Sequence, residues 1–143
     1  MNIYQKPRRA VTEALLMTCN LPTQDLTDDH FEHFFGCGKA ESPAGVVGVE
    51  LHGSAGLLRS LAVAESARGA GLGKRLIQEA ERYAAQQGVQ DLFLLTNSAA
   101  ELFMSLGYLA IPRHAAPASI QATNEFSSIC PASATLMRKR VAG

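Results

Sequence analysis

Three closely spaced glycines, Gly69, Gly71 and Gly73, are the residues best suited to bind a ligand, and they follow an apolar stretch that ends at Val63. Glycine has no Cβ atom, so the backbone can bend sharply there and come close to a ligand. A helical pattern starts directly afterwards, and a helix start presents unpaired N–H groups and the positive end of its dipole. This arrangement predicts an anion site of the kind that holds phosphate. The alternative is a tight strand-to-helix turn without a ligand.

The spacing excludes two common phosphate motifs. A P-loop has a glycine five residues before its Gly-Lys pair and a Ser or Thr after it. Here Gly73-Lys74 has Arg68 at the first of these places and Arg75 at the second. The dinucleotide fingerprint needs a glycine at position 74 or 76, where lysine and leucine stand. Once these two motifs are excluded, the remaining pattern is Arg-x-x-Gly-x-Gly after a strand, formed by Arg68, Gly71 and Gly73.

Apolar periodicity predicts an α/β fold, a mixed sheet with helices on both faces. Strands are expected over residues 1–5, 31–37, 46–51, 57–63, 92–95, 108–111 and 133–137. Helices are expected over residues 7–20, 24–29, 72–87, 99–106 and 118–127, with Thr23 and Ser98 as N-caps of the second and fourth. The N-terminal strands should be antiparallel, whereas 57–63 and 92–95 should be parallel and joined by a right-handed crossover.

Length and charge limit the class of protein. A chain of 143 residues predicts one domain, residues 1–143, with a real hydrophobic core. Its net charge of zero argues against nucleic-acid or membrane partners held by bulk charge. Without an export signal or an apolar run of membrane-spanning length, we expect a cytoplasmic protein. Cys19, Cys37 and Cys130 are then expected to be free thiols.

The stretch from Leu57 to Tyr108 resembles the core of the Gcn5-related N-acetyltransferases (GNAT). Its glycine turn is similar to their pyrophosphate-binding motif. Asn97 to Tyr108 is similar to their second signature, a helix that ends in Gly107-Tyr108. The resemblance implies the GNAT-like sheet, acetyl-coenzyme A as cosubstrate, and a splay between the strands at Leu61 and Leu95 that admits the cofactor.

The same resemblance implies the cofactor contacts. They are Leu61, Ala62, Val63, Arg68, Gly69, Ala70, Gly71, Leu72, Gly73, Lys74, Asn97 and Phe103. The amides from Arg68 to Lys74 would hold the pyrophosphate, and the strand backbone at Leu61 to Val63 would polarise the thioester. Phe103 stands where many members of the family have the Tyr that protonates the leaving thiolate. Water or Ser98 would then supply the proton, or the thiol leaves unassisted.

A narrower resemblance is to the small acetyltransferases associated with arsenic-resistance operons. It depends on three segments, residues 20–23, 56–63 and 126–134. This resemblance implies a gene neighbourhood more than a substrate.

Acetyl transfer to an amine also needs groups that bind the acceptor and take its proton. Glu50, near the end of a strand beside the central one, is the expected base, and the alternative is a solvated strand-end charge. Arg59 is expected to bind an anionic acceptor group, and the alternative is a structural ion pair. Arg113 and Cys130 lie in a loop, residues 112–131, that we expect over the acceptor. No metal site is expected, because His30 and His33 have no third ligand close in sequence.

These observations predict an acetyl-coenzyme A-dependent N-acetyltransferase that acts on a small, anionic amino compound, with arsenic- or phosphorus-containing amino-acid toxins among the acceptors considered. Two alternatives are a non-catalytic acyl-coenzyme A-binding sensor, which Phe103 favours, and a protein that binds a metalloid through its cysteines. The expected partner is a small-molecule amine, with no nucleic acid and no membrane. A homodimer that pairs edge strands is left open.

Overall fold

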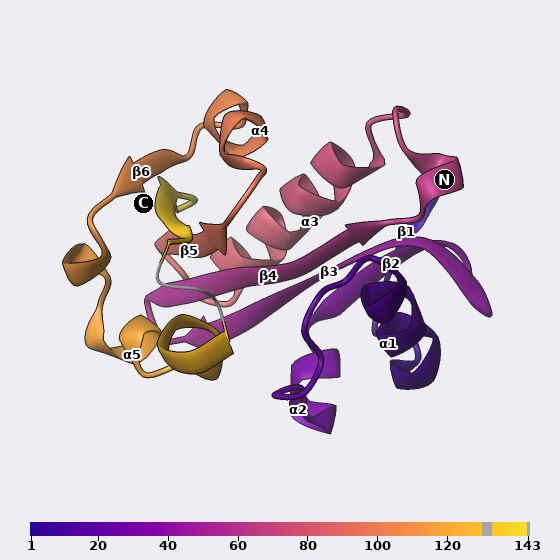
Figure 1. Cartoon of the computed structure of the whole chain (residues 1–143), viewed down its shortest axis with the longest axis horizontal. Helices are drawn as coiled ribbons and strands as arrows, with labels where there is room; N and C mark the ends of the chain where they lie inside the picture. The colour runs from indigo at the N-terminus through magenta and orange to yellow at the C-terminus, as the bar shows by residue number, and fades with distance from the viewer. Residues whose placement is uncertain (130–132, 143) are drawn as a thin grey trace. The chain divides into compact units, whose positions relative to one another are not determined.

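Residues 1–129 and 133–142 are described in the computed structural model of the chain (Figure 1). The strands are β1 (Ile3–Gln5), β2 (Phe34–Lys39), β3 (Ser42–His52), β4 (Ala55–Val63), β5 (Asp91–Thr96), β6 (Leu109–Ile111) and β7 (Thr135–Arg140). The α-helices are α1 (Arg9–Thr18), α2 (Asp28–Phe31), α3 (Leu72–Gln86), α4 (Ala100–Ser105) and α5 (Ala118–Gln121). Single turns of 3₁₀-helix cover Glu65–Ala67 and Arg113–Ala115, and Glu125–Ile129 is a π-helical turn.

The strands form one seven-stranded sheet in the order β1-β2-β3-β4-β5-β7-β6. The pairs β1–β2, β2–β3, β5–β7 and β6–β7 are antiparallel, and β4–β5 is parallel. The expected mixed sheet with one parallel pair is therefore confirmed. The parallel register joins Ala55–Leu57 to Asp91–Phe93. The splay expected at Leu61 and Leu95 lies beyond these paired residues and stays a prediction.

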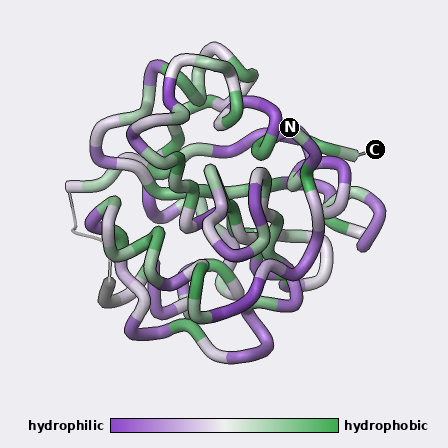
Figure 2. Tube along the Cα trace, turned by 90° about the vertical axis from the view of Figure 1, so that its right-hand side faces the viewer, coloured by the Kyte–Doolittle hydropathy of each residue, from purple (hydrophilic) through white to green (hydrophobic). Residues whose placement is uncertain are grey.

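The chain packs as two compact units, and the expected single domain over residues 1–143 stays a prediction. The first unit holds Met1–Glu50 and Leu58–Arg82, and the second holds Leu51–Leu57 and Tyr83–Gly143. Hydrophobic stretches alternate with hydrophilic ones along the trace (Figure 2), as amphipathic helices and strands require. Among the described residues, no helix has both the length and the apolar character to cross a membrane.

In the first unit, helices cover both faces of the strands. One face carries a core of Leu15, Leu16, Leu26, Phe31, Phe34, Val46 and Ala62. On the other face, Leu76 of α3 lies so close to Gly45 of β3 that a Cβ atom there would be 2.8 Å from the Leu76 Cδ1. Successive strand residues point to opposite faces. Gly45 and Val46 therefore place α3 on one side of the strands and the α1–α2 core on the other.

The long helix α3 forms because its apolar residues recur at helical spacing. The buried ones are Leu72, Leu76, Ile77, Ala80 and Ala84. The helix ends where Gly88 adopts a φ of +94°, a conformation that favours glycine. In the second unit, the core consists of Ala55, Leu57, Phe93, Ala116, Ile120 and Leu136.

Two expected helices are wrong in their bounds. The helix expected over residues 24–29 is α2, which starts at Asp28 after the N-cap Thr27, so Thr23 is not its cap. The helix expected over residues 118–127 is interrupted after α5. There the Thr123 hydroxyl donates to the Ile120 carbonyl at 2.7 Å and accepts the Phe126 N–H at 3.2 Å. Such side-chain bonds to the backbone compete with helical ones.

Candidate functional site

The glycine turn between β4 and α3 has a backbone that only glycine adopts easily. Gly69 has a φ of +88° and Gly71 a φ of +78°. A Cβ atom built at either residue would have no atom within 4 Å. The space beside the turn is therefore open, and glycine is required there for its backbone angle, since nothing would obstruct a side chain.

The start of α3 presents backbone donors to the same place. The first helical bond at this end runs from the Arg75 N–H to the Gly71 carbonyl at 3.1 Å. The N–H groups of the preceding residues lie in the first helical turn, where no carbonyl of the helix can accept them. Gly69, Ala70 and Gly71 are exposed, and so is Lys74. The turn thus combines open space, backbone donors and the positive end of a helix dipole.

Arg68, at the start of the turn, folds back on the end of β4. Its Nε donates to the Val63 carbonyl at 3.1 Å, and its Nη2 lies 3.9 Å from the Cys19 Sγ. The same Val63 carbonyl lies 3.8 Å from the Cys19 Sγ. Arg68 therefore connects the turn to the last residue of β4, where the thioester was expected.

The end of β4 contains a strained residue. Ser60 has a φ of +59°, a left-handed conformation that is uncommon for a residue other than glycine. Such strain is found disproportionately at functional sites. Ser60 lies directly before Leu61, Ala62 and Val63, whose backbone was expected to contact the cofactor.

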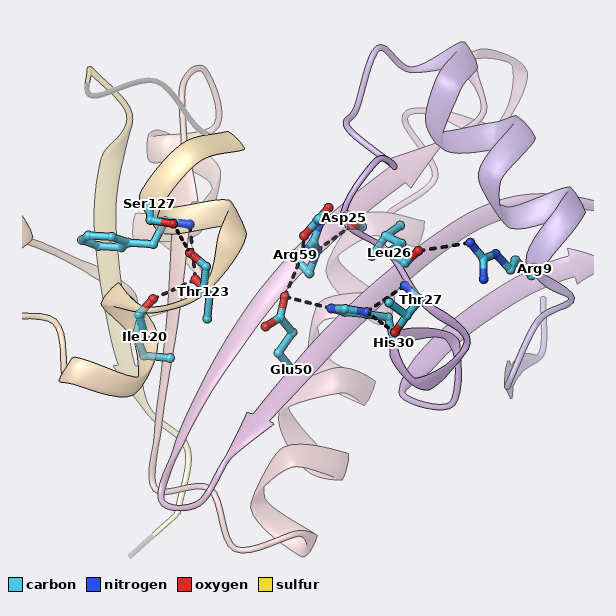
Figure 3. A network of polar contacts seen from close by, with 12 residues as sticks. Arg9, Asp25, Leu26, Thr27, His30, Glu50, Arg59, Ile120, Thr123 and Ser127 are labelled. Atoms are coloured by element: carbon cyan, nitrogen blue, oxygen red, sulfur yellow. Dashed lines mark hydrogen bonds and ion pairs between the residues drawn. The ribbon is translucent and has the colours of Figure 1, made fainter.

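A buried network of charges lies next to this strained residue in the first unit (Figure 3). The Arg59 Nη1 is 2.6 Å from the Asp25 Oδ2 and 2.7 Å from the Glu50 Oε2. The Arg59 Nη2 also donates to the Asp25 Oδ1 at 2.9 Å, and its Nε to the Ser60 Oγ at 3.1 Å. The side chains of Arg59, Asp25 and Glu50 are 0%, 4% and 11% exposed. This geometry favours the ion-pair alternative for Arg59 over an open anion site.

His30, from α2, faces the same carboxylate. Its Nε2 lies 3.5 Å from the Glu50 Oε2, and its Nδ1 accepts the backbone N–H of Thr27 at 3.0 Å. Arg9 of α1 holds the start of α2 by donating to the Leu26 carbonyl at 3.1 Å. Figure 3 shows this chain of contacts from Arg9 through Leu26, Thr27 and His30 to Glu50 and Arg59.

Asp25, His30 and Glu50 have ligand atoms that all lie within 4.8 Å of one another, a spacing that would suit a metal ion. However, the Arg59 guanidinium contacts both carboxylates. A cation would have to displace that positive charge, so the cluster is better described as an ion-pair network.

Asn97 and Ser98 belong to the second unit, after β5. Both are exposed. Ser98 is not the N-cap of α4, because Ala99 occupies that position and its N–H donates to the Thr96 Oγ1 at 3.0 Å. The expected cap at Ser98 is therefore wrong. The suggested roles of Asn97 toward the pantetheine and of Ser98 as a proton donor stay predictions.

The other sequence-predicted residues of the second unit are held by internal contacts. Phe103 is buried and packs edge-on against Tyr108, with ring centroids 5.5 Å apart. Arg113 donates to the Ala134 carbonyl at 3.0 Å and lies 4.7 Å from the centroid of the Phe126 ring. Its proposed contact with the acceptor stays a prediction. Cys130 lies outside the described residues.

Sequence reasoning did not assign Asp25 and His30 to the site. Asp25 comes from the irregular segment before α2, and the residues around it in the sequence do not indicate a role at the site. His30 could have been found, because Thr27-x-x-His30 has the spacing of a capping box, with histidine in the place of the usual Glu or Gln.

Comparison with known proteins agrees with this architecture. The model of the acetyltransferase (GNAT) family matches residues 1–108. A curated N-acetyltransferase of Chlorobaculum tepidum, CT2212, is 36% identical over 63 residues, which are 44% of this chain and 40% of the relative. The chain therefore spans well under two thirds of that relative's length.

Solved structures share the fold. The N-acetylglutamate synthase of Neisseria gonorrhoeae, complexed with coenzyme A and N-acetyl-glutamate, superposes with a TM-score of 0.85 at 18% identity, over 98% of this chain and 35% of its own. Rv2747 of Mycobacterium tuberculosis, also in complex with coenzyme A, superposes with a TM-score of 0.78 at 16% identity, over 98% of this chain and 99% of its own. A GNAT acetyltransferase of Staphylococcus aureus superposes with a TM-score of 0.73 at 15% identity, over 98% of each chain.

Proposed function

Because this chain belongs to the acetyltransferase (GNAT) family, we propose that it transfers an acetyl group from acetyl-coenzyme A to the amine of a small amino compound. The observation that carries the proposal is the turn from Arg68 to Lys74. Two glycines with positive φ leave open space in front of the first turn of α3. That space suits the pyrophosphate of the cosubstrate, because backbone N–H groups and the helix dipole both favour a negative charge there.

The reaction assigns tasks to residues of the first unit. The amine nitrogen attacks the thioester carbonyl carbon, the new N–C bond forms and the C–S bond breaks. Backbone N–H groups among Leu61, Ala62 and Val63 would stabilise the negative charge that develops on the carbonyl oxygen. Glu50 would receive the proton of the acceptor ammonium through water. Coenzyme A leaves as a thiolate, which needs no strong acid because thiols are far more acidic than alcohols. The second proton of the attacking nitrogen goes to water or to this thiolate.

We further propose that the acceptor carries an anionic group, with arsenic- or phosphorus-containing amino acids among the candidates. The N-acetyl-glutamate bound to the Neisseria synthase supports an anionic acceptor, and the resemblance to arsenic-resistance acetyltransferases suggests which anionic groups to test. In this chain, an acceptor anion would compete with Asp25 and Glu50 for the Arg59 guanidinium. A cytoplasmic location belongs to the same proposal. A homodimer would form through β1 or β6, which are the two edges of the strand order.

Thiol release from acetyl-coenzyme A tests the proposal. The panel is L-glutamate, its phosphinic-acid and arsinic-acid analogues, L-glutamine as a neutral control of matched size, and spermidine as a cationic amine. We expect amine-dependent release that is faster with the acidic amino acids than with L-glutamine. L-glutamine keeps the α-carboxylate and has a neutral side chain, so equal rates with it would contradict the need for an anionic side chain. No release with any amine would contradict the transferase.

One observation favours a second candidate, an acyl-coenzyme A-binding sensor. Phe103 is buried and has no hydroxyl to protonate a leaving thiolate. Tight binding of coenzyme A by calorimetry, without thiol release for any amine of the panel, would support the sensor. If the chain is an enzyme whose proton donor was lost, Phe103→Tyr should raise kcat and leave KM for acetyl-coenzyme A unchanged.

A further inference from the structure

Two contacts of the His30 ring indicate which ring nitrogen carries the proton when the ring is neutral. Its Nδ1 lies 3.0 Å from the backbone nitrogen of Thr27, which donates its N–H, and 3.0 Å from the Thr27 Oγ1, whose hydroxyl can donate to an Nδ1 without a proton. A ring nitrogen that accepts a hydrogen bond cannot carry a proton, so the proton of the neutral imidazole is on Nε2. This contact also completes the capping box at the start of α2.

The Nε2–H of His30 faces Glu50. The Nε2 lies 3.5 Å from the Glu50 Oε2, which is within ion-pair distance and about 0.5 Å longer than a usual N–H···O hydrogen bond. On its other side, the same Oε2 lies 2.7 Å from the Arg59 Nη1. One carboxylate oxygen is thus held between a guanidinium and an imidazole.

The network is close to the proposed position of the thioester. Arg59 is two residues before Leu61 on β4, which is about 7 Å along an extended strand. Asp25, Glu50 and Arg59 together leave one negative charge in excess. This excess negative charge attracts the ammonium group of an approaching acceptor. His30 is ill suited to be the base itself, because a proton on its Nδ1 would break the bond from Thr27.

We propose that His30 is the positioning residue for Glu50: its Nε2–H orients the carboxylate that binds and deprotonates the acceptor ammonium. The proposal rests on the proposed N-acetyltransferase function. It does not require His30 to touch the acceptor or the cofactor.

Two substitutions separate this role from the helix cap. Both His30→Gln and His30→Glu keep a side chain that can complete the capping box. Gln retains an N–H donor for Glu50, whereas Glu places a second carboxylate against it. We expect His30→Glu to lower kcat/KM for the most active amine of the panel by about 100-fold, and His30→Gln to stay within about fivefold of wild type. The Kd for coenzyme A should be unchanged in both.

Gln87→Glu is the control, since it also adds a carboxylate, at an exposed residue directly after α3. It should leave kcat/KM at the wild-type value. Wild-type kcat/KM for His30→Glu, in a protein that is otherwise active, would overturn the positioning role. An equal loss in His30→Gln and His30→Glu would also overturn it, because it would point to a need for the imidazole itself.

A second measurement does not depend on activity. Long-range ¹H–¹⁵N NMR spectra of the histidine rings, recorded on the wild-type protein without ligand, should show His30 as the Nε2–H form. Its ring signals should shift in Glu50→Gln. The Nδ1–H form would overturn the proposal. If the Nε2–H form is found and the wild type releases no thiol with any amine, the proposed function fails while the contact with Glu50 stands.

Discussion

Arg59 and Asp25 form a bidentate ion pair, in which Nη1 lies 2.6 Å from Oδ2 and Nη2 lies 2.9 Å from Oδ1. Arg59 belongs to β4, and Asp25 to the segment between α1 and α2. The pair therefore fastens that segment to the strand, two residues before Leu61. Both side chains are almost fully buried. Buried charges of this kind are tolerated only when they are paired.

Removing the Arg59 guanidinium should lower the stability of the fold. We expect Arg59→Ala to lower the free energy of unfolding by about 3–5 kcal/mol, because Asp25 and Glu50 would then be buried beside each other without a cation. Urea denaturation of the ligand-free protein measures this. Asp25→Asn should cost less, since Arg59 keeps its contact with Glu50.

Arg82→Ala is the matched control, because Arg82 pairs with Glu79 at 3.1 Å on the surface of α3. That pair is exposed and should contribute less than about 1 kcal/mol. Equal losses for Arg59→Ala and Arg82→Ala would contradict the structural role of Arg59. A raised KM for an anionic acceptor at unchanged stability would instead restore Arg59 as its binding residue.

The strained backbone at Ser60 allows a second prediction. Ser60→Val should destabilise the protein by about 2 kcal/mol, because a β-branched residue fits a φ of +59° poorly. Ser60→Gly should stay within about 1 kcal/mol of wild type, since the relief of strain offsets the lost contact with Arg59. Urea denaturation again distinguishes them, with Ser60→Ala as the control for the hydroxyl alone. If glycine is as harmful as valine, the left-handed conformation at this residue is not present in solution.

Cys37 offers a test of burial in the first unit. Desolvation by burial raises the pKa of its thiol. The folded chain then holds this proton more tightly than the unfolded chain. The contribution to stability is complete below the pKa of a free thiol, about 8.5, and is lost as pH rises through the higher folded pKa. We expect iodoacetamide at pH 8 to modify Cys37 at least about tenfold more slowly than Cys19, which is half-buried.

Peptide mass mapping with and without urea measures this difference. The two rates should become similar in urea. Equal rates in the folded protein would show that Cys37 is accessible and would contradict its packing in β2.

The fold was predictable because its strongest signals are periodic and local. The apolar spacing of α3 and the apolar run of β5 identify a helix and a buried strand without any tertiary information. The position of α2 was less predictable, since Thr23 and Thr27 are both good N-caps. Thr27 is the N-cap because the His30 side chain accepts its backbone N–H and so completes a capping box. Likewise, the break after α5 depends on a single hydroxyl, that of Thr123.

The site was predictable only in part. Closely spaced glycines are visible in the sequence itself, so the turn at Gly69 and Gly71 was predicted from it. The partners of Arg59 were not, because Asp25 and Glu50 are 34 and 9 residues away in the chain. Pairing over such separations is decided by tertiary packing. Arg59 therefore allowed two interpretations in the sequence, and the geometry favours one of them.

The proposed acetyl transfer depends most on the turn from Arg68 to Lys74, which is proposed to hold the pyrophosphate. Gly71→Glu introduces a side chain and a negative charge into the open space before α3. Gly53→Glu is its matched control, because Gly53 has a φ of +70°, and a Cβ atom there also meets no atom within 4 Å. Gly53 lies in the β3–β4 hairpin, so the two variants share the backbone strain and differ in position.

The most direct measurement is the Kd for coenzyme A, by calorimetry, in these two variants and in wild type. We predict that Gly71→Glu weakens binding by at least about 100-fold, while Gly53→Glu binds as wild type does and both variants remain folded by circular dichroism. Wild-type affinity in a folded Gly71→Glu variant would contradict the assignment of this turn as the cofactor site.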